Sequence, residues 1–180
     1  MPTDNRVWFH AILSTYGAWL YGDPRGFRTR HHREHVDGDY KNRPPEGMYA
    51  AQEKRSRDSL KQDPVVFPPH LRQVVGEALQ DKLTRLGAWV LVMSVSGQHV
   101  HMLVKLPPKL ARKWLGMAKM HTSFELKKHR WTGKVWAVRC RPEQIRDKAH
   151  QTNTFHYIER HAEQGAWVGV WKTPPEVPKK

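Results

Sequence analysis

The sequence contains a single cysteine, Cys140, among its 180 residues. One thiol cannot form an intrachain disulfide, which excludes a disulfide-stabilised fold and favours a reducing compartment. Long apolar runs are also missing, since none approaches the roughly 20 residues needed to cross a bilayer. The first residues carry no apolar core of a secretory signal. We therefore expect a cytoplasmic protein without a membrane partner.

Acidic residues are scarce relative to basic ones. The chain has 17 Asp and Glu against 31 Lys and Arg, a formal net charge of +14. The imbalance is concentrated in residues 105–148, where 13 basic residues stand against Glu125, Glu143 and Asp147. A localised basic surface favours a polyanionic partner, and nucleic acid is the first candidate, which would make the protein nucleoid-associated.

Residues 22–64 lack hydrophobic periodicity and are rich in Gly, Pro, Arg, His and Asp. Their charges nearly balance, so this segment is interpreted as an insertion, not as a basic tail. Within it, the run Arg30–His35 is open to two interpretations, a metal-binding cluster or a solvated loop. A second segment, from about residue 172, is expected to form a loose C-terminal tail.

Hydrophobic periodicity predicts alternating strands and helices in one domain spanning residues 1–180. The helix at 109–129 is expected to bury one stripe made of Leu110, Trp114, Met117, Ala118, His121 and Phe124. The order βαββαβ predicts an α+β, ferredoxin-like antiparallel sheet with helices on one face and an appended C-terminal helix. The expected strands are 6–17, 88–95, 99–106 and 135–139, and the expected helices are 68–87, 109–129 and about 143–164.

The strongest candidate for chemistry is the segment His99-Val100-His101 in the expected strand 99–106. Residues two apart in a strand point to the same face, so both imidazoles should lie side by side. Such a pair is either two polar residues on an exposed sheet face or two ligands of one divalent metal.

A second candidate lies in the last expected helix, where His161 follows Tyr157 by four residues. Positions four apart share a helix face, so the phenol and the imidazole should be neighbours. Tyr157 is either a residue at the edge of the core or a nucleophile.

Together these residues resemble the IS200-like and REP-associated single-tyrosine transposases, a family of HUH endonucleases. The resemblance covers most of the chain outside residues 22–64, which match nothing in the family. It implies that His99 and His101 bind Mg²⁺ or Mn²⁺ and that Tyr157 attacks a DNA phosphate, forming a 5′-phosphotyrosine. It also implies that His161 completes the metal shell, at a position where the family commonly has glutamine.

The implied function is therefore a single-strand DNA endonuclease and strand transferase acting in DNA transposition. Its partner would be single-stranded or hairpin DNA, and the resemblance leaves open a homodimer in which one subunit's tyrosine serves the other's histidines. Two alternatives remain: a non-catalytic, domesticated hairpin or single-strand binder, and a metal-dependent phosphoesterase of small molecules. Eight basic residues are expected to contact nucleic acid: Lys109, Arg112, Lys113, Lys119, Lys127, Arg130, Arg139 and Arg141.

Overall fold

The computed structural model describes residues 5–25, 27 and 45–173. The run Arg30–His35 and the end of the predicted tail lie outside these residues. The elements are β1 (Val7–Thr15), α1 (Ala50–Asp58), α2 (Pro69–Arg85), β2 (Trp89–Val95), β3 (His99–Leu106), α3 (Ala111–Lys128), β4 (Trp136–Gln144), α4 (Lys148–Glu159) and β5 (Trp167–Val170), with short 3₁₀ turns at Pro108–Leu110 and Arg160–Gln164.

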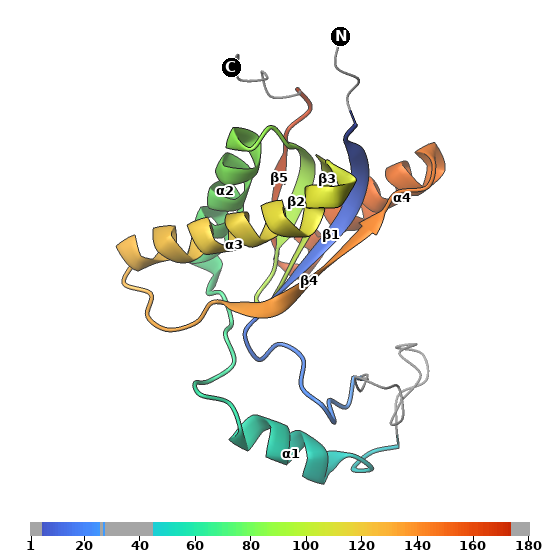
Figure 1. Ribbon diagram of the computed structural model, residues 1–180. Helices are drawn as coiled ribbons and strands as arrows, with labels where there is room; N and C mark the ends of the chain where they lie inside the picture. The colour runs from blue at the N-terminus through green and yellow to red at the C-terminus, as the bar shows by residue number, and fades with distance from the viewer. Residues whose placement is uncertain (1–4, 26, 28–44, 174–180) are drawn as a thin grey trace.

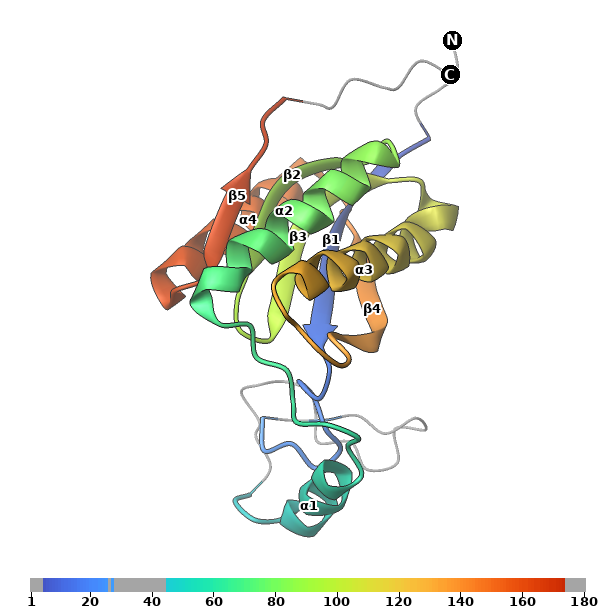
Figure 2. The same ribbon diagram turned by 90° about the vertical axis from the view of Figure 1, so that its left-hand side faces the viewer.

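The expected α+β class is confirmed. Five antiparallel strands form one sheet in the order β4-β1-β3-β2-β5. Helices α2 and α3 cover one face, and α4 packs on the other face against β2 and β3 (Figures 1 and 2). The sheet is thus a central layer between two unequal helical layers.

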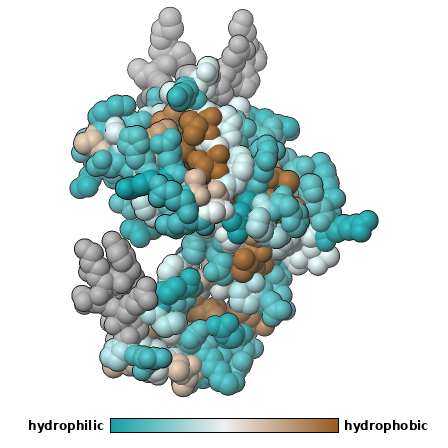
Figure 3. All heavy atoms as spheres, turned by 180° about the vertical axis from the view of Figure 1, so that it is seen from behind, coloured by the Kyte–Doolittle hydropathy of each residue, from teal (hydrophilic) through white to brown (hydrophobic). Residues whose placement is uncertain are grey.

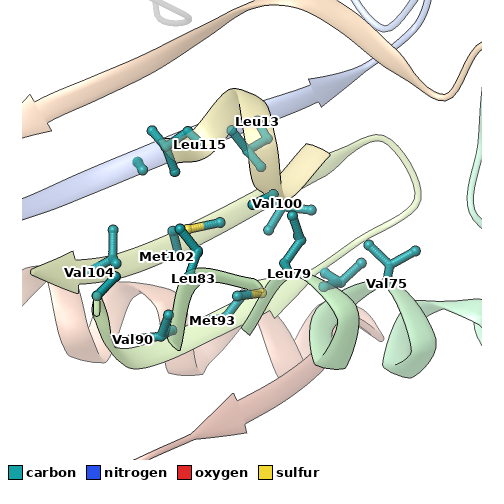
Figure 4. Packing of buried hydrophobic residues seen from close by; sticks show 14 of the residues in the cluster. Leu13, Val75, Leu79, Leu83, Val90, Met93, Val100, Met102, Val104 and Leu115 are labelled. Atoms are coloured by element: carbon teal, nitrogen blue, oxygen red, sulfur yellow. The ribbon is translucent and has the colours of Figure 1, made fainter. Parts of the chain in front are cut away.

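The alternation of side chains along β3 explains both layers. Val100, Met102 and Val104 are buried toward α2 and α3, where they meet Leu79 and Leu83 (Figure 4). The alternate positions of β3 face α4 instead, where a smaller apolar cluster forms around Leu103, Val92 and Ile158. A strand buried on both faces explains why 99–106 has so many apolar residues.

The predicted buried stripe of α3 is wrong in its phase, although its member Ala118 is buried as expected. Leu110 is 40% exposed and Phe124 is 60% exposed. A stripe displaced around the same helix also has helical spacing, and packing against the sheet selects it. Its buried members are Ala111, Leu115, Ala118, Lys119, Thr122 and Leu126.

Two predicted boundaries and one missing element also need correction. The last helix begins at Lys148, not at 143, because Asp147 caps it by accepting a hydrogen bond from the backbone N–H of His150 at 2.7 Å. The preceding strand extends to Gln144, beyond the predicted end at 139, because it pairs along β1. Strand β5, four residues long, was not predicted at all.

Residues 22–64 are not without structure, because α1 lies within them. This helix lies below the sheet in both ribbon views (Figures 1 and 2). Backbone hydrogen bonds from Val65 to Tyr16 (2.8 Å) and from Phe67 to Gly97 (2.7 Å) tie the returning chain to the sheet. No helix among the described residues is long and apolar enough to cross a membrane.

Candidate active site

His99 and His101 project from β3 toward α4. Because β3 lies between β1 and β2, both imidazoles sit over the middle of the sheet, and both are partly buried. Across from them on β1 are Ser14, paired with His99, and Ile12, paired with His101. The same-face spacing seen in the sequence therefore exists in the folded strand.

Helix α4 and the 3₁₀ turn that follows it bring Tyr157 and His161 to the same place. The ring of His101 stacks on that of His161 with centroids 4.8 Å apart. The ring of Tyr157 stands edge-on to both, 4.7 Å from His161 and 5.6 Å from His101. Ile158, fully buried between α4 and the sheet, fixes the helix in this position.

The hydrogen bonds of these imidazoles indicate which nitrogens are free to bind a ligand. Nδ1 of His161 lies 2.9 Å from the carbonyl oxygen of Tyr157, which can only accept, so this nitrogen carries a proton, and in the neutral ring the lone pair is at Nε2. Nε2 of His99 is buried and has no hydrogen-bond partner within the described part of the chain. An unsatisfied buried nitrogen requires an explanation, and a ligand is one.

Burial also sets the charge of the two strand histidines. It lowers the pKa of His99 below the ordinary value of 6.5. The pKa of His101 falls to about 3, because burial and then the neighbouring His10, His161 and His99 disfavour the imidazolium. Neutral imidazole is the form that coordinates metal, so both residues are in the ligating state at neutral pH.

His10, on β1, belongs to the site but was not among the predicted residues. Its Nε2 lies 3.1 Å from Nδ1 of His101, and its ring centroid is 5.9 Å from that of Tyr157. A hydrogen bond at Nδ1 leaves Nε2 of His101 for a metal, as outer partners of ligating histidines commonly do. Its place one strand away, diagonal to His101, depends on the pairing of β1 with β3.

The three imidazoles are donors that suit a divalent metal, although their side chains are not oriented to coordinate one ion together. Among the residues described, no three His, Cys, Asp or Glu side chains are placed to hold one ion. The rings of His101 and His161 are nearly parallel, at 29°, so their in-plane lone pairs do not converge. Binding therefore requires a side chain to rotate, and the exposed turn carrying His161 is the part best able to do so.

A cavity of about 640 Å³ opens above these groups, large enough for part of a nucleotide strand. His99, His101 and Tyr157 line one side, and Arg139 and Arg141 of β4 line the other. The nucleophile candidate is accessible, since Tyr157 is 43% exposed. The arrangement sets two guanidinium groups, that of Arg141 also 3.3 Å from the Glu143 carboxylate, across a cavity from the phenol and the buried neutral imidazoles of His99 and His101. Guanidinium groups suit an anionic phosphodiester.

The eight predicted nucleic-acid contacts do not form one surface. Arg139 and Arg141 flank the cavity, and Arg112 shares a groove with Arg139 between α3 and β4. The remaining exposed residues lie on or just beyond the ends of α3, on the opposite side of the sheet from α4: Lys109, Lys113, Lys127 and Arg130.

Lys119 is a correction. Its side chain is buried, and its ammonium group donates hydrogen bonds to the carbonyl oxygens of Ala137 and Val138. Burial lowers its pKa. It ties α3 to β4 with its ammonium group held at the backbone of β4, because the helix turns this position toward the sheet.

Comparison with known proteins gives no family for this chain. No protein-family model matches it, and no curated protein does.

Proposed function

We propose that the protein is a single-strand DNA endonuclease and strand transferase in which Tyr157 forms a 5′-phosphotyrosine intermediate. The observation that carries the proposal is the convergence of Tyr157, His101 and His161 from two elements far apart in sequence. A tyrosine with only a structural role would not need to stand edge-on to two imidazoles at a cavity that two arginines also line.

The fold supports the same assignment. The strand order β4-β1-β3-β2 with two helices on one face is that of a ferredoxin-like unit, to which α4 and β5 are added. In this reading α4 is the appended helix that brings the tyrosine over the central strand. The ring contacts among His101, His161 and Tyr157 all lie within one chain, so the proposed site needs no residue from a second subunit.

Each group then has a distinct role. Arg139 and Arg141 bind the backbone of the single strand and hold a phosphate above Tyr157. The phenolic oxygen attacks phosphorus and loses its proton, while the bond to the 3′-oxygen breaks and that oxygen takes up a proton. The covalent link conserves the phosphodiester energy, so the strand can be rejoined without a nucleotide cofactor.

His99, His101 and His161 are the residues that would hold Mg²⁺ or Mn²⁺. A bound ion would neutralise charge on the scissile phosphate and make phosphorus easier to attack. His10 positions His101 through the hydrogen bond at Nδ1.

The unfinished donor geometry favours a second candidate, a domesticated protein that binds single-stranded or hairpin DNA without cutting it. The two functions are separated by a labelled single-stranded oligonucleotide incubated with Mn²⁺ and run on a denaturing gel. The transferase leaves a covalent protein–DNA band with the wild-type chain and none with Tyr157→Phe.

The matched control is Tyr49→Phe, which removes the hydroxyl of a tyrosine packed against Phe27 and outside the cavity. It should give the adduct at the wild-type rate. Adduct formation by Tyr157→Phe would exclude Tyr157 as the nucleophile, and binding without any adduct in the wild type would favour the non-catalytic binder.

A further inference from the structure

A second cavity, of about 490 Å³, lies between the loop after β1 and helix α1. Aromatic rings form its walls, from Trp19, Tyr21 and Phe27, and Ser56 and Ser59 of the α1 segment supply hydroxyls. Trp19 and Tyr21 are 51% and 50% exposed, unusual for large rings on a chain this polar. Figure 3 shows apolar surface on this lower part of the molecule, below the sheet.

The loop that carries these rings is held in place by specific contacts. Gly22, at φ +87°, packs so closely on the start of α1 that a Cβ there would lie 2.3 Å from the backbone nitrogen of Glu53. The buried carboxylate of Asp23 accepts hydrogen bonds from the Arg25 side chain at 2.9 and 2.6 Å. Arg25 also donates to the Ala18 carbonyl oxygen at 2.7 Å. The walls are therefore preorganised, which lowers the entropy lost on binding.

Trp19 joins this cavity to the active site. It lines both cavities, and its ring stands edge-on to His99 with centroids 5.6 Å apart. The guanidinium of Arg25 lies 4.3 Å from the centre of the same ring. A strand whose phosphate reaches Tyr157 can therefore place an adjacent base beside Trp19 without leaving the surface.

We propose that this cavity binds one unpaired nucleobase of the DNA strand, next to the phosphate held at Tyr157. The proposal rests on the function proposed above and adds a specificity pocket to it. Exposed aromatic rings are the platforms on which single-stranded bases stack. The Ser56 hydroxyl can donate and accept at a base edge, whereas the Ser59 hydroxyl, which donates to the Ser56 carbonyl oxygen at 2.8 Å, can accept there. The Arg25 guanidinium, ion-paired with Asp23, holds the Trp19 ring from one face.

The described part of the 22–64 insertion supplies Phe27 and the α1 segment to this cavity. The volume fits a small planar ligand, being within the roughly 300–1,000 Å³ typical of such pockets. Trp19 also lines the cavity that holds Arg139 and Arg141, and the chain has a net charge of +14; both facts favour a nucleic-acid base over an apolar metabolite.

The test, on the full-length chain, measures whether the effect of removing one DNA base depends on the residues of the pocket. The probes are fluorescent DNA hairpins with a short single-stranded tail, in which the hairpin foot fixes the register and an abasic residue replaces each tail base in turn. Dissociation constants are measured by anisotropy in EDTA, so that no cleavage interferes. We expect one tail position at which loss of the base weakens wild-type binding on the order of tenfold.

The pocket variants are Tyr21→Ala, which removes a wall, and Ser56→Trp, which fills the cavity. In both, the same abasic substitution should have almost no further effect, because the base no longer has its site. Phe124→Ala, which truncates a 60% exposed ring on α3, is the matched control and should keep the full abasic effect. Circular dichroism of each variant checks that α1 and the sheet remain folded.

The outcomes of this test separate the two proposals. If the wild type forms the covalent adduct but every abasic effect persists in Tyr21→Ala and Ser56→Trp, the pocket proposal is overturned and the transferase stands. If abasic coupling to the pocket appears but no adduct forms, the pocket is a base site of a non-catalytic binder, and only the transferase proposal falls.

Discussion

The burial of His101 makes the stability of the protein depend on pH in a way that one substitution isolates. The imidazole has a pKa of about 3 in the folded protein, against 6.5 as the reference for an unfolded chain. Because the folded value is the lower one, the unfolded chain binds the extra proton between these two pH values. The contribution of His101 is therefore fully present above pH 6.5 and is lost as pH falls toward 3.

The magnitude follows from this difference alone. Between pH 7.5 and 5.5 the unfolded imidazole goes from about 9% to about 91% protonated, while the folded one stays neutral. This linkage lowers the free energy of unfolding by about 1.4 kcal/mol for His101. His10 and His99, whose pKa values are also lowered by burial, act in the same direction.

The assay is urea unfolding at the two pH values in EDTA, followed by tryptophan fluorescence. His101→Gln should show a drop in stability between pH 7.5 and 5.5 that is about 1.4 kcal/mol smaller than that of the wild type. The control is Ile158→Val, which removes one methyl group from the contact between α4 and the sheet. It should lower stability by about 1 kcal/mol at both pH values and leave their difference unchanged. If His101→Gln lost as much stability on acidification as the wild type, His101 would not be buried as a neutral group.

Three further predictions concern the basic surface and the site. Affinity for single-stranded DNA should fall with salt, by roughly 0.7 log units per log unit of salt for each phosphate neutralised, and a flat dependence would contradict the basic surface. Arg139→Met should reduce that slope by about 0.7, because Arg139 lines the cavity that holds Tyr157. Lys119→Met should leave the slope unchanged and lower the free energy of unfolding by about 1–2 kcal/mol, as checked by anisotropy and urea titration. His10→Ala should weaken Mn²⁺ binding about 10–100-fold in calorimetric titration, and an unchanged Kd would show that His10 does not orient His101.

The central part of the fold was predictable because its patterns are local. The run 99–106 is apolar at nearly every position except the two histidines. Gly87 marks the end of the helix before the sheet strands, and Pro107-Pro108 marks the end of the run itself. The i+4 relation of Tyr157 and His161 is likewise a property of one turn of helix, and the folded chain keeps it as a hydrogen bond. Local period and spacing were therefore sufficient to name most of the candidate site.

The errors arose where two local solutions were equally good. Helix α3 offers two stripes, and only contact with the sheet decides that Leu115 and Lys119 turn inward while Phe124 turns outward. For that reason Lys119, which was predicted to contact a phosphate, is instead buried and donates hydrogen bonds to the backbone of β4. Helix phase is a tertiary property, so composition alone assigns such a residue to the wrong surface.

The parts of the site that sequence reasoning missed are those that depend on strand pairing. His10 comes about 90 positions before its hydrogen-bond partner, His101, and meets it because β1 pairs with β3 in one register. Shifting that register by a single residue would turn His10 to the other face of the sheet and leave Nδ1 of His101 without this partner. Trp19 depends on the same pairing, since the end of β1 sets where the following loop leaves the sheet beside His99. The two-histidine motif thus marks where chemistry is expected, whereas the register of β1 determines which groups orient that motif and which base-sized cavity opens next to it.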